Sequence, residues 1–176
     1  MDSTACVHLY ASQGFNVQGL FVDYGQPPRH RERLAADKIT GFYGINIQHL
    51  AFEPSQQIGW GEIVGRNAFL LFSGLMHIGR RAGVLASGVH SGTSYYDCSP
   101  DFFHNVQSIF DGYSSGRIQI AAPFLTWDKR EIWNYCMKEK VPIDLTYSCE
   151  RGDDQPCRRE SQIYYGQGIL IHVYTM

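Results

Sequence analysis

The sequence has no long apolar run, no excess of basic residues and no regular spacing of cysteines. No run reaches the roughly 18 apolar residues that span a bilayer and no segment resembles a signal peptide, so we expect a cytoplasmic protein without a membrane partner. Fifteen Lys and Arg against seventeen Asp and Glu give a net charge of −2, which argues against broad electrostatic binding to nucleic acid. Hydrophobic residues at 44% and charged residues at 18% are typical of a folded protein rather than a disordered one.

The five cysteines are odd in number and lack a secretory context, which argues against a disulfide scaffold. Cys149 and Cys157 lie eight positions apart in a polar segment. Two thiolates cannot close a tetrahedral zinc site, which needs four ligands. The local residues alone therefore leave two interpretations open, a partial metal site and a pair of unrelated cysteines.

Apolar patterns that alternate between helix and strand predict an α/β fold for these 176 residues. The expected helices cover residues 2–13, 29–41, 67–81, 102–110 and 128–140, and the expected strands cover residues 17–22, 45–52, 84–89 and 117–122. This alternation is typical of βαβ units, which build a parallel sheet with helices on both faces.

Helical spacing also predicts which side chains face the core. Expected inner positions are Leu34, Ala35 and Ile39 in the second helix, Ile109 in the fourth, and Ile132, Trp133, Cys136 and Met137 in the last. Asp128 and Glu131 have the spacing of a capping pair. The neighbouring Lys129 and Arg130 are interpreted as part of a solvated helix face.

The loops after the expected strands hold most of the distinctive polar residues. In open α/β sheets, ligands bind beyond the carboxyl ends of the strands. We therefore expect the site on the loops at residues 23–31, 53–67, 90–100 and 123–128. His90 and Cys98 share one of these loops and are interpreted as structural, since no nucleophilic triad has a recognisable spacing.

Three short segments each allow a functional and a structural interpretation. Asp2, Ser3 and Thr4 open the first helix, where free N–H groups and the helix dipole favour an anion, or where these side chains simply cap the helix. Residues 23–26 suit either a nucleoside site or a plain turn. Arg66 begins a helix, and its guanidinium either binds a phosphate or carboxylate or remains solvated.

Six short motifs follow one another along residues 1–157. They are Asp-Ser-Thr-Ala-Cys at residues 2–6, Asp-Tyr-Gly-Gln at 23–26 with Arg-His-Arg at 29–31, Gly-Arg-Asn at 65–67, Ser-Gly-Val at 87–89, Tyr-Asp-Cys at 96–98, and Pro-Phe-Leu-Thr-Trp-Asp-Lys at 123–129. Each is weak alone, but together and in this order they resemble the 7-cyano-7-deazaguanine synthase family of PP-loop (N-type) ATP pyrophosphatases.

The resemblance implies an ATP-dependent ligase with a Rossmann-like adenine nucleotide alpha hydrolase fold. Members of the family use ATP and Mg²⁺ to activate the carboxylate of 7-carboxy-7-deazaguanine as an adenylate. Ammonia then gives an amide, and a second activation with loss of water gives 7-cyano-7-deazaguanine, a queuosine precursor. The resemblance also implies a homodimer and no direct contact with nucleic acid.

The motifs also imply roles for individual residues. The residues expected to bind the nucleotide, the first three of them through its pyrophosphate, are Asp2, Ser3, Thr4, Asp23, Tyr24, Gln26 and Arg66. Asp97, expected near the deazaguanine, and Arg66 are the candidate catalytic residues. Cys149 and Cys157 are the candidate ligands of a Zn²⁺ ion.

The sequence departs from the family pattern in two places. It lacks the family's first strand and its Ser-Gly-Gly, and that strand belongs at the sheet centre, between residues 17–22 and 84–89. Cys157 is followed by no further cysteine, so two of the four zinc ligands are missing. We therefore expect a form truncated at both ends, with an incomplete pyrophosphatase-like domain at residues 1–146.

Residues 147–176 are then expected to be a remnant of the zinc-binding segment followed by an unrelated tail. Within this tail, residues 169–174 have the composition of a strand. We expect this segment to pair with an exposed sheet edge.

Two other functions stay open at this point. One is a different PP-loop pyrophosphatase that acts on another carboxylate or carbonyl substrate. The other is a catalytically inactive module that binds an adenine nucleotide or a partner. AMP release with another substrate would favour the first, and ATP binding without AMP release would favour the second.

Overall fold

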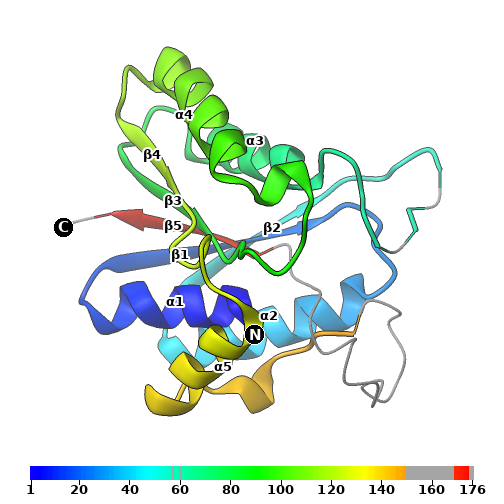
Figure 1. Cartoon of the computed structure of the whole chain (residues 1–176), viewed down its shortest axis with the longest axis vertical. Helices are drawn as coiled ribbons and strands as arrows, with labels where there is room; N and C mark the ends of the chain where they lie inside the picture. The colour runs from blue at the N-terminus through cyan, green and yellow to red at the C-terminus, as the bar shows by residue number, and fades with distance from the viewer. Residues whose placement is uncertain (57, 60, 150–168, 175–176) are drawn as a thin grey trace.

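A computed structural model gives the fold and describes residues 1–149, apart from 57 and 60, together with residues 169–174 (Figure 1). The helices are α1 (Asp2–Ser12), α2 (Arg29–Tyr43), α3 (Arg66–Ile78), α4 (Pro100–Ser114) and α5 (Lys129–Lys138). The strands are β1 (Asn16–Asp23), β2 (Asn46–Ala51), β3 (Gly83–Ser87), β4 (Ile118–Ala121) and β5 (Ile169–Tyr174). Short 3-10 turns lie at Tyr96–Cys98 and Ile143–Leu145. The predicted alternation is confirmed, with boundaries that shift by a few residues.

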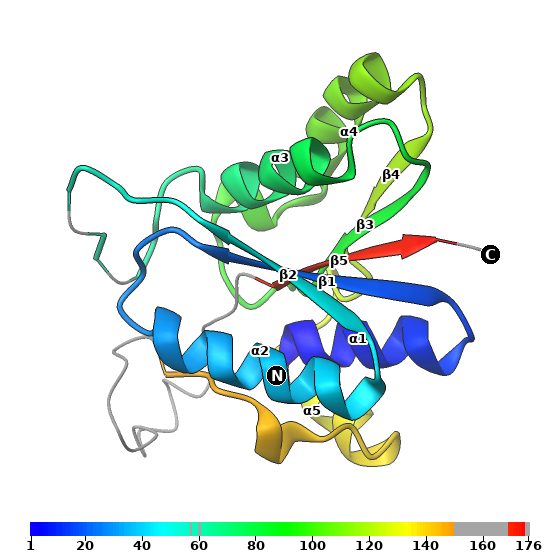
Figure 2. The same cartoon turned by 180° about the vertical axis from the view of Figure 1, so that it is seen from behind.

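The strands form one sheet in the order β2-β1-β5-β3-β4. Strand β1 runs parallel to β2, and β3 runs parallel to β4. Helices α1, α2 and α5 cover one face of this sheet, and α3 and α4 cover the other (Figures 1 and 2). The predicted α/β class, with helices on both faces, is therefore confirmed.

Strand β5 lies in the middle of the sheet and runs antiparallel to both of its neighbours (Figure 1). Leu170 lies opposite Leu20 of β1 and Ser87 of β3, so both strand edges are hydrogen-bonded. Leu170 packs with α3 and α4, whereas Ile171 packs with α1, α2 and α5, as the alternation of a strand requires. The tail thus pairs with two edges at once.

This position between β1 and β3 is the one that the family resemblance assigns to the family's first strand. Strand β5 therefore belongs to the same sheet as residues 1–146. The domain boundary expected at residue 146 stays a prediction for the segment that follows it.

The predicted burial of several side chains is wrong. The side chains that prove exposed are Leu34 (61%), Ile109 (48%), Trp133 (44%) and Met137 (49%). Each of them directly adjoins a buried residue of its helix, and one residue along a helix turns the side chain by about 100°. The other expected inner positions of these two helices, Ala35 and Ile39 in α2 and Ile132 and Cys136 in α5, are confirmed as buried. Helix α2 also buries Ala36.

The carboxyl ends of β1, β2, β3 and β4 lie at one edge of the sheet because these four strands share one direction. The beginning of α1 packs closely against this edge. A Cβ atom on Gly88, directly after β3, would lie 2.6 Å from the carbonyl carbon of Asp2. Glycine at this position therefore lets the first turn of α1 approach the end of β3.

Among the described residues, none of the helices has the length and apolar character that crossing a membrane requires.

Candidate functional site

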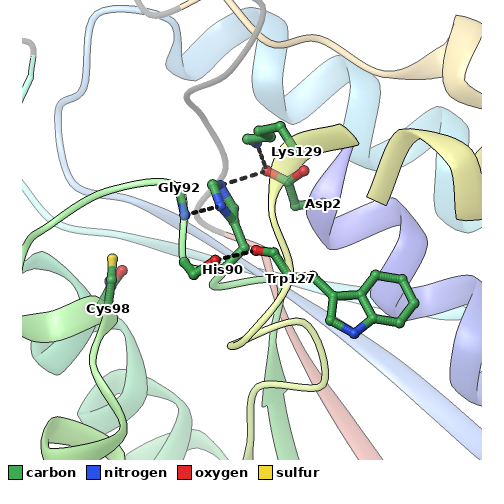
Figure 3. Close-up of polar contacts among 8 residues, drawn as sticks. Asp2, His90, Gly92, Cys98, Trp127 and Lys129 are labelled. Atoms are coloured by element: carbon green, nitrogen blue, oxygen red, sulfur yellow. Dashed lines mark hydrogen bonds and ion pairs between the residues drawn. The ribbon is translucent and has the colours of Figure 1, made fainter. Parts of the chain in front are cut away.

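The first turn of α1 carries a buried carboxylate at the edge where the parallel strands end. Asp2 is 6% exposed, and its Oδ2 accepts a hydrogen bond from the ammonium group of Lys129 (Figure 3). The Lys129 side chain is only 12% exposed. The expectation that Lys129 belongs to a solvated helix face is therefore wrong, because the fold brings the beginning of α5 to the beginning of α1.

Helix α5 begins at Lys129 because of its capping box. The Asp128 carboxylate accepts from the backbone N–H of Glu131 at 2.8 Å, and the Glu131 carboxylate accepts from the N–H of Asp128 at 2.7 Å. The predicted capping pair is confirmed. It fixes the first turn of α5 and with it the origin of the Lys129 side chain.

His90, from the loop after β3, is the third side chain of this group. Its Nε2 lies 3.7 Å from Asp2 Oδ2, and its Nδ1 accepts from the backbone N–H of Gly92 at 2.8 Å (Figure 3). Burial, with a contribution from the positive charge of Lys129, lowers the pKa of His90 to about 4. The ring is therefore neutral at pH 7. We refer below to Asp2, His90 and Lys129 as the Asp2 group.

Two polar atoms in the first turn of α1 are buried without a hydrogen-bond partner in the described structure, Asp2 Oδ1 and Thr4 Oγ1. Ser3 is buried beside them. The first helical hydrogen bond runs from Ala5 N–H to Met1 O, so the preceding N–H groups lie before the intrahelical ladder. A helix start with unused donors and a nearby cation is suited to an anion.

A second group of contacts lies at the beginning of α3. The Asp97 carboxylate accepts from the backbone N–H of Asn67 at 3.1 Å. The Asn67 amide donates back to the Asp97 carbonyl at 3.0 Å. Asp97 thus caps α3 across 30 positions of sequence, and its predicted contact with substrate stays a prediction.

Cys98 adjoins this cap and is half-buried. Its Sγ lies 3.7 Å from the Asn67 amide nitrogen. Burial raises the pKa of the Cys98 thiol, so the thiol stays protonated at pH 7. This agrees with the structural interpretation of Cys98, because a nucleophilic cysteine requires a lowered pKa.

Arg66 is the first residue of α3 and lies close enough to Cys98 for its charge to influence the thiol. Within the described residues, its guanidinium makes no hydrogen bond and no ion pair. Arg66 is therefore available to an anionic ligand at the carboxyl edge, and its predicted role stays a prediction.

The loop after β1 is held in shape by its own polar groups. Asp23 Oδ1 accepts from Gly25 N–H at 3.0 Å, and Gln26 Oε1 accepts from Tyr24 N–H at 2.9 Å. The buried Gln26 amide also donates to Glu32 at 2.9 Å. Gln26 therefore shapes the loop, and the predicted nucleotide contacts of Asp23, Tyr24 and Gln26 stay predictions.

The candidate zinc ligands are described only in part. Cys149 is buried, whereas Cys157 lies outside the described residues. In the part of the chain that the structure describes, no group of three or more His, Cys, Asp or Glu side chains is arranged to hold a metal ion. The Zn²⁺ prediction stays a prediction.

Sequence reasoning missed Lys129 and His90 as members of the site. Both follow strands whose carboxyl ends face the site, which was the one available signal. A charged first turn of a helix is more often solvated, and only the tertiary contact between α5 and α1 distinguishes Lys129 from Arg130.

Comparison with known proteins adds a separate line of support. A family model described as "Queuosine biosynthesis protein QueC" matches residues 62–161. A protein named 7-cyano-7-deazaguanine synthase from Prochlorococcus marinus (strain MIT 9303) is 31% identical, and the match covers 89% of this chain and 82% of that relative.

Two further relatives carry the same name. The protein from Synechococcus sp. (strain RCC307) is 31% identical, with 89% of this chain and 84% of the relative covered. The protein from Campylobacter jejuni is 26% identical, with 89% and 83% covered.

Proposed function

Because the chain belongs to the QueC family of queuosine biosynthesis proteins, an enzyme family, we propose that it uses ATP to convert 7-carboxy-7-deazaguanine and ammonia to 7-cyano-7-deazaguanine. The reaction would proceed through an acyl adenylate. The observation that carries the proposal is the Asp2 group at the start of α1, which joins unused polar atoms to a buried cation.

The start of α1 has the features that a triphosphate needs. A helix N-terminus favours a negative charge by about 0.3–1 kcal/mol at exposed sites and by more where it is partly buried. Thr4 Oγ1 has no hydrogen-bond partner in the described structure and can donate one, and the Lys129 ammonium lies at the same helix start, paired with the Asp2 carboxylate. We therefore propose that Asp2, Ser3 and Thr4 bind the pyrophosphate portion of ATP, with Lys129 as a further contact.

ATP is needed because a carboxylate is a poor electrophile. Attack of the carboxylate on the α-phosphorus forms the acyl adenylate and releases pyrophosphate. Ammonia then attacks the carbonyl carbon, and AMP leaves with the former carboxylate oxygen. The amide oxygen then attacks the α-phosphorus of a second ATP, which releases a second pyrophosphate. Departure of AMP with that oxygen, together with loss of the two protons of the amide nitrogen, leaves the nitrile.

The protein's task in such a reaction is to position the reactants and stabilise charge. Arg66, whose guanidinium has no ion pair among the described residues, is proposed to contact the phosphates or the substrate carboxylate. Asp97 is proposed to lie near the deazaguanine through the carboxylate oxygen that does not cap α3. Asp23, Tyr24 and Gln26 are proposed to border the nucleotide.

Mg²⁺ is proposed to accompany ATP, held mainly by phosphate oxygens and water, as is usual for this ion. A Zn²⁺ ion is proposed on Cys149 and Cys157, with its remaining ligands unassigned. A homodimer is proposed as the assembly.

The test incubates the purified full chain with ATP, Mg²⁺, 7-carboxy-7-deazaguanine and an ammonium salt. We expect AMP, pyrophosphate and 7-cyano-7-deazaguanine, identified by mass spectrometry, and no AMP above background when the deazaguanine is omitted. AMP release with a different carboxylate would instead favour another PP-loop pyrophosphatase. ATP binding without AMP release under any of these conditions would favour the inactive binding module.

A matched pair of variants tests the site itself. Arg66→Ala should lower kcat/KM about a hundredfold, the order expected when a charged group that stabilises developing charge is removed. Arg80→Ala removes an exposed arginine beyond the other end of the same helix and should leave kcat/KM unchanged. Wild-type kcat/KM in Arg66→Ala would remove Arg66 from the mechanism.

A further inference from the structure

His90 lies outside the motifs that carry the family resemblance, yet it faces the same carboxylate oxygen as Lys129 (Figure 3). Its side chain is 11% exposed. A buried histidine that is turned toward a buried carboxylate of a candidate ATP site needs an explanation beyond the packing of its loop.

The contacts of the ring determine its tautomer. Nδ1 accepts a hydrogen bond from Gly92 N–H at 2.8 Å, and a ring nitrogen that accepts carries no proton. The proton of the neutral ring therefore lies on Nε2, the nitrogen that faces Asp2 Oδ2 at 3.7 Å. This distance exceeds that of a direct hydrogen bond, so the N–H dipole acts electrostatically on the carboxylate.

The His90 loop and the loop before α5 are joined as one unit. The backbone N–H and the hydroxyl of Ser91 both donate to the Trp127 carbonyl, at 3.1 Å and 2.7 Å. Trp127 lies two residues before Lys129. The two donors that face Asp2 Oδ2 are thus fixed relative to each other, and both leave Asp2 Oδ1 without a partner.

We propose that His90 is a positioning residue for Asp2. The Nε2–H group of His90 acts together with the Lys129 ammonium on Asp2 Oδ2, and so fixes the orientation of the Asp2 carboxylate for ATP binding. The inference rests on the proposed function in that it takes ATP as the ligand. Because the His90 ring is neutral, it orients the Asp2 carboxylate without adding a second positive charge to the Asp2–Lys129 pair.

The first experiment determines the tautomer in the ligand-free wild-type protein. Long-range ¹H–¹⁵N NMR spectra should show His90 as the Nε2–H tautomer, with no change of protonation between about pH 6 and pH 8, since its pKa lies far below the usual 6.5. An Nδ1–H tautomer, or a titration midpoint near 6.5, would overturn the proposal. This measurement needs no ATP and stands even if the proposed function fails.

The second experiment uses two substitutions to distinguish the contribution of His90 Nε2 from that of His90 Nδ1. His90→Gln retains a donor where Nε2 lies, whereas His90→Asn retains only a group near Nδ1. We expect His90→Gln to keep the Kd for ATP within about threefold of wild type and His90→Asn to weaken it about tenfold, the effect of about one lost polar interaction. Equal losses in both variants would show a role in loop structure only and would overturn the proposal.

A double-mutant cycle tests whether His90 acts through Asp2. In a D2N background, His90→Asn should change the Kd for ATP by less than about twofold, because the carboxylate that it orients is gone. Additive effects would contradict the proposal. Ser91→Ala is the control for loop anchoring, because it keeps the bond from the Ser91 N–H to the Trp127 carbonyl and removes only that from the hydroxyl. Its loss of ATP affinity should therefore be smaller than that in His90→Asn, and an equal loss would also contradict the proposal. Failure of the wild-type chain to bind ATP would refute the proposed function, and the NMR experiment would then decide the role of His90.

Discussion

Strand β5 and the four parallel strands form one sheet, but they contribute different things to it. Each parallel strand ends at the carboxyl edge and leads into a loop there. Candidate site residues lie at these strand ends and loops, among them Asp23 at the end of β1 and His90 after β3. Strand β5 runs the other way and directs its last residue, Tyr174, away from that edge. It supplies buried apolar side chains and backbone hydrogen bonds on both sides.

From this difference we expect stability and ligand binding to depend on different parts of the sheet. Changes in β5 should lower the free energy of unfolding without a specific effect on ATP binding. Changes at the carboxyl edge should affect ATP binding by more than their cost in stability explains. The four predictions that follow test this separation.

The largest effect is expected from Ile171→Asp. Ile171 is 1% exposed at the centre of the sheet, and an unpaired carboxylate there costs several kcal/mol, comparable with a total stability of about 5–15 kcal/mol. We expect loss of the cooperative unfolding transition in urea, followed by circular dichroism. Tyr174→Asp, at an exposed position of the same strand, should retain the transition. A cooperative, near-wild-type transition in Ile171→Asp would show that β5 is dispensable.

The contrast between β5 and the other strands also marks how far sequence could predict the fold. Alternation of apolar patterns was sufficient for the four parallel strands, because each packs against a helix next to it in sequence. Composition predicted β5 as a strand, but its place depends on two edges formed by residues 16–23 and 83–87. Such non-local pairing leaves no periodic signal in the tail itself.

The same limit applies to the candidate site. Asp2, Ser3 and Thr4 by themselves left the start of α1 open between an anion site and an ordinary helix cap, and only the family resemblance favoured the anion site. The Asp2–Lys129 pair could not be predicted from the sequence, since it joins residues 127 positions apart. The sequence also predicts Trp133 and Met137 on the buried face of α5, whereas both are exposed. A short helix offers few apolar residues from which to define its buried face.

The second prediction concerns the carboxyl edge. Lys129→Met leaves the Asp2 carboxylate buried without its cation, which should cost about 3–5 kcal/mol of stability and abolish measurable ATP binding. The double variant D2N/K129M removes both charges and should recover most of the stability without recovering ATP binding. Urea unfolding and titration calorimetry measure the two effects. Recovery of ATP binding in the double variant would show that neither the Asp2 carboxylate nor the Lys129 ammonium is needed to bind ATP.

The third prediction is a dependence of stability on pH that originates in β5. His172 is buried, and this burial, with smaller contributions from Arg81 and His77, lowers its pKa. The unfolded chain therefore binds a proton more readily than the folded one, so His172 costs stability as the pH falls below about 6.5. The cost is about 1.4 kcal/mol for each unit by which folding lowers the pKa.

Urea unfolding at pH 7.5 and pH 5 checks this, with His172→Gln as the test variant. His172→Gln should show a smaller loss of stability between these pH values than wild type. His90 contributes in the same direction, because its pKa is lowered to about 4, so some dependence should remain. His104→Gln, on an exposed position of α4, should keep the wild-type dependence. An unchanged dependence in His172→Gln would contradict the assignment to β5.

The smallest expected effect separates two helix caps of the same kind. Asp128→Ala removes the cap of α5 and Ser99→Ala removes the cap of α4, and each should cost about 1 kcal/mol of stability. Only the cap of α5 fixes the turn from which Lys129 reaches Asp2. Only Asp128→Ala should therefore also weaken ATP binding. The expected loss is about threefold to tenfold in Kd, the effect of losing part of the ion-pair geometry. Calorimetry on both variants makes the comparison at matched stability. Equal losses of ATP affinity would mean that general stability, rather than the position of Lys129, governs binding, and the separation between the sheet centre and its carboxyl edge would no longer hold.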